Sequence, residues 1–260
     1  MPTLVPDYKK VILFGDSQTE LSWNQGLDFS FSAGLQHYYM RRADVLNRGL
    51  CGYNTIWLKS QFDRVVHELE RVGKDNALLF VLWLGTNDCP LENTLHHVPV
   101  DQFIKNVSQY IKIIQERFPL AKILLITPAP ISETKLRSSS SRTQGRDRSQ
   151  CETKKYVDAL LSHDFGYGDV VRKVDLFTAI AEAAGYSSFS NVFDEHNPLT
   201  ADRELRIGEF TLDGLHLNGK GYKVLYNHIT TVLNQWPGVS MADLPGVEPG
   251  WLDKSKKFTK

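Results

Sequence analysis

The chain has 260 residues, of which 42% are hydrophobic and 23% are charged, a balance typical of a globular protein with a sizeable core. Lysine and arginine together number 30, aspartate and glutamate also number 30, and the formal net charge is therefore zero. Proteins that bind nucleic acid through its phosphates are usually basic, so this balance argues against a nucleic-acid partner. The length predicts one domain over 1–260, with its core at about 10–236 and a C-terminal extension at 237–260.

Neither a signal peptide nor a membrane span is expected. The opening stretch, MPTLVPDYKK, lacks the apolar centre of a signal peptide. The most apolar run, ALLFVLWLG, is much shorter than the roughly 20 residues that cross a bilayer. The three cysteines are odd in number and widely spaced, without a metal-binding pattern. These features predict reduced thiols in a cytoplasmic protein.

Apolar runs alternate with amphipathic segments along the chain. Strands are predicted at 10–15, 43–49, 76–85, 121–127 and 169–175, and helices at 56–72, 101–118 and 220–236. The third and fourth strands are apolar at nearly every position, as central parallel strands covered on both faces are. This order predicts an α/β fold, a three-layer α/β/α sandwich around a mainly parallel, five-stranded sheet. Sites in such sheets form beyond the carboxyl ends of the strands.

Two segments interrupt this alternation. Residues 137–149, RSSSSRTQGRDRS, contain no apolar side chain and predict a solvated, mobile loop. Residues 187–210 are long for a connection and suggest a functional or lid-like insertion. The tail from Pro237 is expected to be irregular and to pack over the body through Trp251.

Ser17 lies two residues after the end of the first predicted strand, in the stretch FGDSQTE. A serine at the start of a helix is more often an N-cap than a nucleophile. As a nucleophile it needs a base, because its hydroxyl is barely ionised at neutral pH.

The stretch FTLDGLHLNGKGY contains a base and a carboxylate three residues apart, His216 and Asp213, with Gly214 between them. In a turn, this spacing can bring the carboxylate to one imidazole nitrogen and leave the other nitrogen free to accept a proton. On spacing alone, the pair is explained equally well if Asp213 is a turn residue and His216 lies at the entry to a helix.

Two further residues follow predicted strands: one has a side chain suited to a developing oxyanion, and the other has a backbone N–H that can come close to a substrate. Asn87, in WLGTNDCP, carries a neutral side-chain donor, although Asn-Asp is also an ordinary turn pair. Gly52, in RGLCGYNT, has no side chain to cover its backbone N–H, which can therefore approach a substrate. A glycine with only a structural role in a loop would give the same pattern. Each motif alone also fits a structural role, and their order along the chain is what points to acyl transfer.

Together, FGDSQTE, GLCGYNT, GTND and DGLH resemble the SGNH or GDSL-type esterase and lipase superfamily, in the family's order and over nearly the whole fold. The resemblance implies a flavodoxin-like SGNH hydrolase fold, with Ser17 as nucleophile, His216 as base and Asp213 as its orienting carboxylate. It also implies an oxyanion hole made by the backbone N–H groups of Ser17 and Gly52 and the side chain of Asn87. An α/β-hydrolase is disfavoured because Thr19 stands where that family has a second glycine.

A narrower resemblance, carried also by HVPVDQFIKN and LITPAPISET, is to the isoamyl acetate-hydrolysing esterase group. It implies hydrolysis of short-chain esters, notably acetates of small alcohols, with no metal or organic cofactor, and is compatible with a homodimer. Gln18 stands where the family commonly has an aliphatic residue, and Cys51 where it commonly has serine. These departures leave the polarity of the pocket open.

Several alternatives remain at this point. Cys51 is a competing nucleophile without a better-matched base, and Asp16, Asp88, Asp213 and His216 could be metal ligands. His96 and His97 fit either a loop or a substrate contact. The same chemistry could act on thioesters, lysophospholipids or acetylated sugars, and a non-catalytic α/β binding module is the alternative from another class.

Overall fold

The computed structural model describes residues 8–139, 147–185 and 206–246. Five strands form one sheet: β1 (Lys9–Gly15), β2 (Ala43–Gly49), β3 (Ala77–Trp83), β4 (Lys122–Ile126) and β5 (Val171–Val174). Their order is β2-β1-β3-β4-β5, and every neighbouring pair is parallel. The predicted five-stranded parallel sheet is therefore confirmed, with strand ends within about two residues of those expected.

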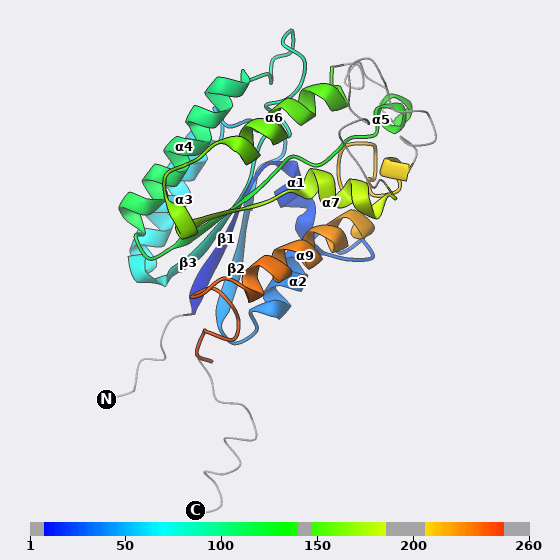
Figure 1. Ribbon diagram of the computed structural model, residues 1–260. Helices are drawn as coiled ribbons and strands as arrows, with labels where there is room; N and C mark the ends of the chain where they lie inside the picture. Colours follow the sequence, from blue (N-terminus) through cyan, green and yellow to red (C-terminus); the bar gives the residue numbers. More distant parts are fainter. Residues whose placement is uncertain (1–7, 140–146, 186–205, 247–260) are drawn as a thin grey trace, which may run out of the picture.

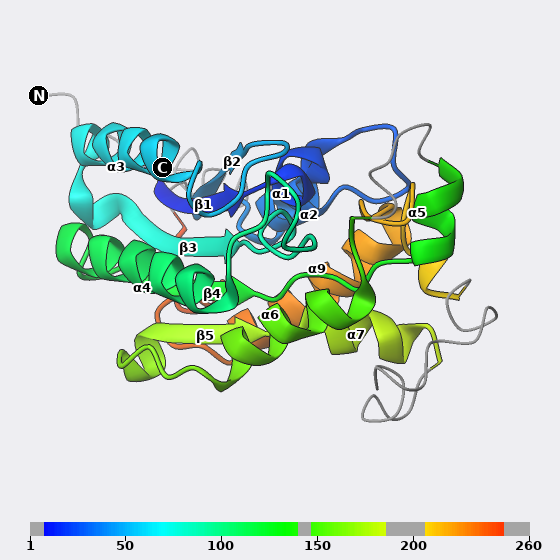
Figure 2. The same ribbon diagram turned by 90° about the horizontal axis from the view of Figure 1, so that it is seen from above.

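Helices cover both faces of this sheet, as Figures 1 and 2 show. One face carries α3 (Lys59–Val72), α4 (Val100–Arg117) and α6 (Gln150–Ser162). The other carries α2 (Phe31–Tyr38), α7 (Leu176–Ala183) and α9 (Gly219–Asn234). The predicted three-layer α/β/α sandwich is confirmed.

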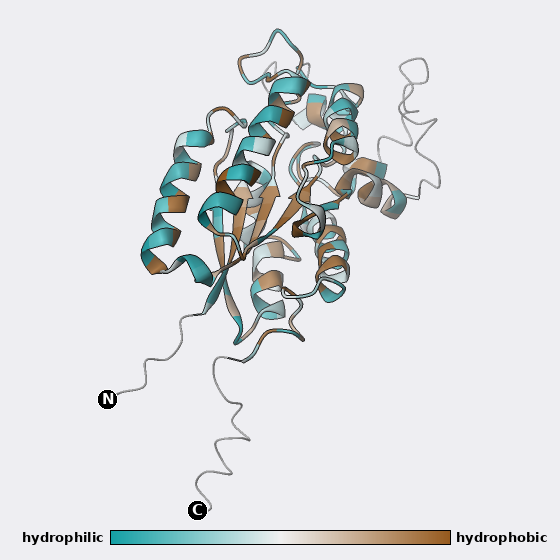
Figure 3. Ribbon diagram, turned by 60° about the vertical axis from the view of Figure 1, so that its left-hand side comes forward, coloured by the Kyte–Doolittle hydropathy of each residue, from teal (hydrophilic) through white to brown (hydrophobic). Residues whose placement is uncertain are grey.

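The apolar pattern of the strands accounts for these layers. All seven residues of β3 are buried, because this strand has a neighbour on each side and a helix layer on each face. Figure 3 shows the hydrophobic strands enclosed by helices with mixed faces. Each helix layer packs on its own cluster of side chains, Leu35, Ile180 and Ile229 on one face and Phe62, Ile111 and Leu160 on the other.

Helix boundaries differ from the sequence predictions in two ways. The helix expected from residue 56 begins at Lys59, because the Asn54 side chain accepts hydrogen bonds from the backbone N–H groups of Ile56 and Trp57 and holds them in a turn. Helices α2, α6 and α7 were not predicted. The first and last have eight residues each, which is too short for a clear 3.6-residue period.

The segments that interrupt the alternation are partly described. The expectation of a solvated loop at 137–149 is wrong at its ends. There, α5 (Glu133–Ser139) extends to Ser139, and Ser149 caps α6 by accepting from the Glu152 N–H. Most of 187–210, and Trp251, lie outside the described residues. Of the tail, Val239 is fully buried in the core.

The strand order places a switch point between β1 and β3. The chain leaves β1 toward β2 on one side, then returns to add β3 on the other side of β1. The loops that follow these two strands diverge, and the crevice between them is where ligands of open α/β sheets bind. No helix in the described ranges is both long and apolar enough to cross a membrane.

Candidate active site

Ser17 lies at the carboxyl end of β1, at the switch point. It is the first residue of α1 (Ser17–Glu20) and is almost fully buried. The helix is capped by Asp16, whose Oδ1 accepts a hydrogen bond from the Gln18 N–H at 2.9 Å. The interpretation of Ser17 as the N-cap is therefore wrong by one residue, because the Asp16 carboxylate occupies the N-cap position and already accepts the hydrogen bond from that N–H. The Ser17 hydroxyl is left for another role.

Asp213 and His216 lie in a closed turn that directly precedes α9. An isolated antiparallel bridge between Thr211 and Leu217 closes it, and Gly214 holds its tip with a φ of +97°. The Gly214 carbonyl accepts from the Ser132 N–H at 2.8 Å. A Cβ on Gly214 would lie 2.4 Å from the backbone nitrogen of Leu136, so only glycine fits. The turn is thus fastened to the start of α5.

The three predicted side chains form one chain of hydrogen bonds. Asp213 Oδ2 lies 2.7 Å from His216 Nδ1, and His216 Nε2 lies 3.0 Å from Ser17 Oγ. The other carboxylate oxygen, Asp213 Oδ1, accepts from the N–H groups of Leu215 at 3.0 Å and His216 at 2.8 Å. Asp213 is therefore both a turn residue and the partner of the imidazole, and the two readings do not compete.

The charge state of Asp213 follows from these contacts. Burial by itself raises the pKa of this carboxyl, but the hydrogen bond and charge of His216 and the two backbone N–H groups outweigh it. The pKa of Asp213 is held well below its ordinary value. The carboxylate therefore stays ionised at neutral pH and fixes a proton on Nδ1, which leaves Nε2 as the acceptor facing Ser17.

Gln18 fastens the histidine turn to α1, a role that sequence reasoning missed. Its side chain is buried; its Nε2 donates to the Leu215 carbonyl at 2.7 Å, and its Oε1 accepts from the Leu217 N–H at 3.1 Å. These two backbone groups flank His216 on either side. Both polar atoms of the Gln18 side chain therefore bind the turn. This departure from the family pattern serves to hold the turn that carries His216. The sequence signals for this residue were its place beside Ser17 and its departure from the aliphatic residue common in the family.

The predicted oxyanion donors come from the loops after β1, β2 and β3. Gly52 has a φ of +81° and open space where a Cβ would be. Within the described residues, no hydrogen-bond acceptor is recorded for its N–H. Asn87 is 5% exposed, and its Nδ2 donates to the Tyr53 carbonyl at 3.2 Å. Asn87 also lies in a turn, so a role as a turn residue is compatible with a role as an oxyanion donor.

Comparisons with known proteins agree with this geometry. The sequence profile of the GDSL-like Lipase/Acylhydrolase family matches residues 11–229. The chain belongs to this family. The human isoamyl acetate-hydrolyzing esterase 1 homolog is 29% identical over 255 residues, covering 95% of this chain and 88% of its own. The isoamyl acetate-hydrolyzing esterase of Saccharomyces cerevisiae is 27% identical, with 87% of each chain covered.

The fold has counterparts among solved structures. An acetylxylan esterase from Geobacillus stearothermophilus superposes with a TM-score of 0.58 at 15% identity, over 87% of this chain and 94% of its own. The family and the relatives named as esterases identify this GDSL-family member as a carboxylic ester hydrolase. The resemblance stated from the four motifs is confirmed.

Two buried carboxyl groups lie beneath the site of this GDSL-family hydrolase. Burial raises the pKa of Asp16 to about 6 and that of Asp88 to about 7, although hydrogen bonds from the Gln18 N–H and from Thr55, respectively, oppose the shift. Asp88 accepts from both the backbone N–H and the hydroxyl of Thr55. It thereby ties the loop that carries Gly52 to the loop that carries Asn87.

The alternative nucleophile and the alternative metal site have less support. Desolvation, followed by the nearby Glu20 carboxylate, raises the pKa of the Cys51 thiol, which disfavours the reactive thiolate. Within the described residues, no group of three or more His, Cys, Asp or Glu side chains is arranged to hold a metal ion. Asp16, Asp88 and Asp213 each have the structural partners given above.

The two neighbouring histidines lie in the loop after β3. His97 Nδ1 is 2.7 Å from the Pro90 carbonyl, and the His96 ring lies 5.0 Å from that of Trp57. A loop role accounts for His97. His96, half-buried beside an exposed aromatic ring, stays a candidate for a substrate contact.

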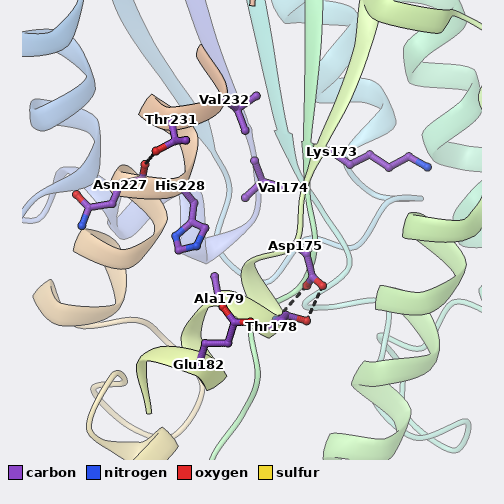
Figure 4. Close-up of a pocket in the computed structure, with 10 residues that line it drawn as sticks. All are labelled: Lys173, Val174, Asp175, Thr178, Ala179, Glu182, Asn227, His228, Thr231 and Val232. Atoms are coloured by element: carbon purple, nitrogen blue, oxygen red, sulfur yellow. Dashed lines mark hydrogen bonds between the residues drawn. The ribbon is translucent and has the colours of Figure 1, made fainter. Parts of the chain in front are cut away.

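A separate hollow lies between β5, α7 and α9 and contains none of the triad residues (Figure 4). Two of its polar side chains have partners within the fold. Asp175 accepts from the backbone N–H and the hydroxyl of Thr178 and so caps α7, and His228 Nδ1 lies 3.0 Å from the Val224 carbonyl. This hollow is not part of the candidate active site.

Proposed function

We propose that this protein hydrolyses short-chain carboxylic esters through an acyl-enzyme on Ser17. The observation that carries the proposal is the continuous hydrogen-bonded chain from Asp213 through His216 to Ser17 Oγ. A nucleophilic serine requires an adjacent base, and the base requires an orienting group. All three are present at the carboxyl edge where α/β sheets bind ligands.

In the first half-reaction, Ser17 Oγ attacks the ester carbonyl carbon while His216 Nε2 accepts the hydroxyl proton. Negative charge develops on the carbonyl oxygen, and the donors suited to it are the N–H groups of Ser17 and Gly52 and the Asn87 amide. His216 then gives its proton to the departing alcohol. The ionised Asp213 stabilises the imidazolium that exists between these two transfers.

In the second half-reaction, water attacks the acyl-enzyme by the same route. His216 accepts a proton from the water, and the tetrahedral intermediate collapses to release the acid as Ser17 takes the proton back. No step requires a metal or an organic cofactor, because the proton acceptor, the nucleophile and the oxyanion donors are all supplied by the chain.

The proposed substrates are acetate esters of small alcohols, such as isoamyl acetate. Support comes from the human and yeast relatives, both named for isoamyl acetate hydrolysis, which align with most of this chain. Thioesters, lysophospholipids and acetylated sugars are the alternatives within the same chemistry. A homodimer remains a prediction from the family resemblance.

The test has two parts. First, the intact protein is weighed after incubation with a fluorophosphonate, and we expect a single adduct that is absent from Ser17→Ala. Second, p-nitrophenyl esters of increasing acyl length, isoamyl acetate and acetylated xylose are compared by kcat/KM. Normal turnover of p-nitrophenyl acetate by Ser17→Ala would refute the mechanism. A preference for long acyl chains or sugar acetates would refute the substrate.

A further inference from the structure

We propose that Arg148 is a positioning residue of the oxyanion hole, which fixes the orientation of the Asn87 amide and polarises it. This inference rests on the proposed function. Arg148 lies just before α6, in the segment that the sequence predicted to be a solvated loop. The segment has several arginines, and nothing in the sequence distinguishes this one from the others.

The guanidinium binds two consecutive residues of the loop after β3. Its Nη2 donates to Asn87 Oδ1 at 3.0 Å, and its Nη1 donates to the carbonyl of Thr86. A guanidinium has only donors and stays charged at all pH values that the protein tolerates. The group that faces Arg148 must therefore be the amide oxygen of Asn87, and the amide nitrogen must face the opposite way.

The opposite side of the amide gives the same answer independently. Asn87 Nδ2 donates to the Tyr53 carbonyl at 3.2 Å, and a carbonyl can only accept. A donor-only group on one side and an acceptor-only group on the other exclude the flipped amide. Nδ2 carries two hydrogens, of which Tyr53 takes one. The second hydrogen is the one left to bind an oxyanion.

Arg148 is itself held by a fixed backbone. The preceding Asp147 carbonyl accepts from the Leu91 N–H at 2.7 Å, and the following Ser149 caps α6. Next to these, the Gln150 side chain forms two hydrogen bonds to the backbone of Ile131, at 2.9 and 3.0 Å. The guanidinium is therefore presented from a rigid helix start, as a positioning group requires.

The charge of Arg148 also acts on the groups around it. It opposes the rise in pKa that burial, the largest influence, causes in Asp16 and Asp88. For His96, burial is again the largest influence but lowers the pKa, and the charge of Arg148 lowers it further. The same positive charge, bonded to the oxygen of the Asn87 amide, draws electron density from Nδ2. An amide polarised in this way is a better donor to a developing oxyanion than an amide without a charged partner on its oxygen.

The expected losses are graded. Removing an oxyanion donor costs roughly 100- to 1000-fold in turnover. Arg148→Ala leaves the donor in place, but the amide is then held only by the Tyr53 carbonyl and has lost the polarising charge, so we expect kcat to fall by roughly 10- to 100-fold with KM little changed. Arg148→Gln keeps one donor without the charge, and Arg148→Lys keeps the charge without the two-pronged geometry. Both should retain more activity than Arg148→Ala.

The decisive experiment is a double-mutant cycle between Arg148→Ala and Asn87→Ala, measured with p-nitrophenyl acetate. In the Asn87→Ala background we expect Arg148→Ala to change kcat by less than about threefold, because its target is gone. The affinity for a trifluoromethyl ketone, which forms a tetrahedral oxyanion on the serine, should fall in parallel with kcat in Arg148→Ala. Arg137→Ala, which removes an exposed arginine paired with Glu133, is the matched control and should leave both unchanged.

Losses that add fully in the double variant, or an unchanged ketone affinity, would overturn the proposal. If Arg148→Ala does not fold, the same cycle is run with Arg148→Gln. Failure of the proposed function gives a different result: if the wild type shows no Ser17-dependent turnover, both the proposed function and the role of Arg148 are refuted. Normal Ser17-dependent turnover with additive losses overturns only the role of Arg148.

Discussion

Replacing Gln18 by leucine tests whether the position of His216 depends on α1. This substitution restores the aliphatic character common in the family, and it removes both hydrogen bonds that Gln18 makes across the site. The Leu215 carbonyl loses a donor at 2.7 Å, and the Leu217 N–H loses an acceptor at 3.1 Å. Since Gln18 is 1% exposed, water does not replace these partners without rearrangement.

The cost follows from the number of groups left without partners. A buried polar group without a partner costs about 1–3 kcal/mol, so two of them cost about 2–6 kcal/mol of unfolding free energy. Even the lower figure corresponds to a fall in Tm of about 4–8 °C for a chain of this size. Displacement of a catalytic group by about 1 Å can cost on the order of 100-fold in rate. We therefore expect kcat to fall by roughly 10- to 100-fold.

The assay compares three variants by Tm, by kcat and KM with p-nitrophenyl acetate, and by the rate of fluorophosphonate labelling. Gln18→Leu should lower Tm, kcat and the labelling rate. Gln18→Glu keeps the acceptor for Leu217 but loses the donor to Leu215, and it should also be impaired. Gln115→Leu removes one hydrogen bond, to the Ala121 carbonyl near the opposite end of the sheet, and should lower Tm without changing kcat.

The reasoning is refuted if Gln18→Leu lowers Tm while kcat and the labelling rate stay at the wild-type values. That result would make the two hydrogen bonds structural only, with His216 held by Asp213 and the turn alone.

Three further predictions concern the site and the carboxyls beneath it. Asn87→Ala should lower kcat roughly 100- to 1000-fold without loss of folding, measured by kinetics and circular dichroism; an unchanged kcat would remove Asn87 from the oxyanion hole. Asp213→Ala should lose less activity than Ser17→Ala, because Gln18 still holds the backbone on either side of His216; equal losses in kcat/KM would contradict this. Asp88 has a pKa of about 7 in the folded protein, against an ordinary value of 3.8. Its protonated form therefore favours the folded state, and stability is lost as pH rises from about 4 through 7. Asp88→Asn should reduce the fall in Tm between about pH 5 and pH 8, and Asp63→Asn, at an exposed position, should not. An equal slope of Tm against pH in the wild type and both variants would refute the raised pKa of Asp88.

Much of the fold could be predicted because strands and helices leave local patterns. The stretch at 76–85, apolar at nearly every position, predicted a central strand, and β3 lies within it with every residue buried. Long amphipathic helices such as α3 and α4 were found, since a stripe repeated over several turns is unambiguous. The short helices α2 and α7 were not, because eight residues carry too little periodicity.

The candidate triad could also be named from the sequence, because its motifs keep a fixed order and each follows a strand or precedes the last helix. Its neighbours could not. Gln18 and Arg148 act through side chains that reach segments far along the chain, 197 residues away for the bond from Gln18 to Leu215 and 61 for that from Arg148 to Asn87. Nothing local to either residue announces such a partner.

The chemical groups of this esterase can be recognised in its amino-acid sequence: a serine after β1, a carboxylate and an imidazole three residues apart, and an asparagine after β3. How those groups are held depends on contacts that form only in the folded protein. Capping of α1 by Asp16 left the Ser17 hydroxyl facing His216, and the sheet order brought β1 and β3 together at the switch point. The physical reason is that composition and periodicity encode burial along the chain, whereas hydrogen bonds between distant segments depend on the packed fold.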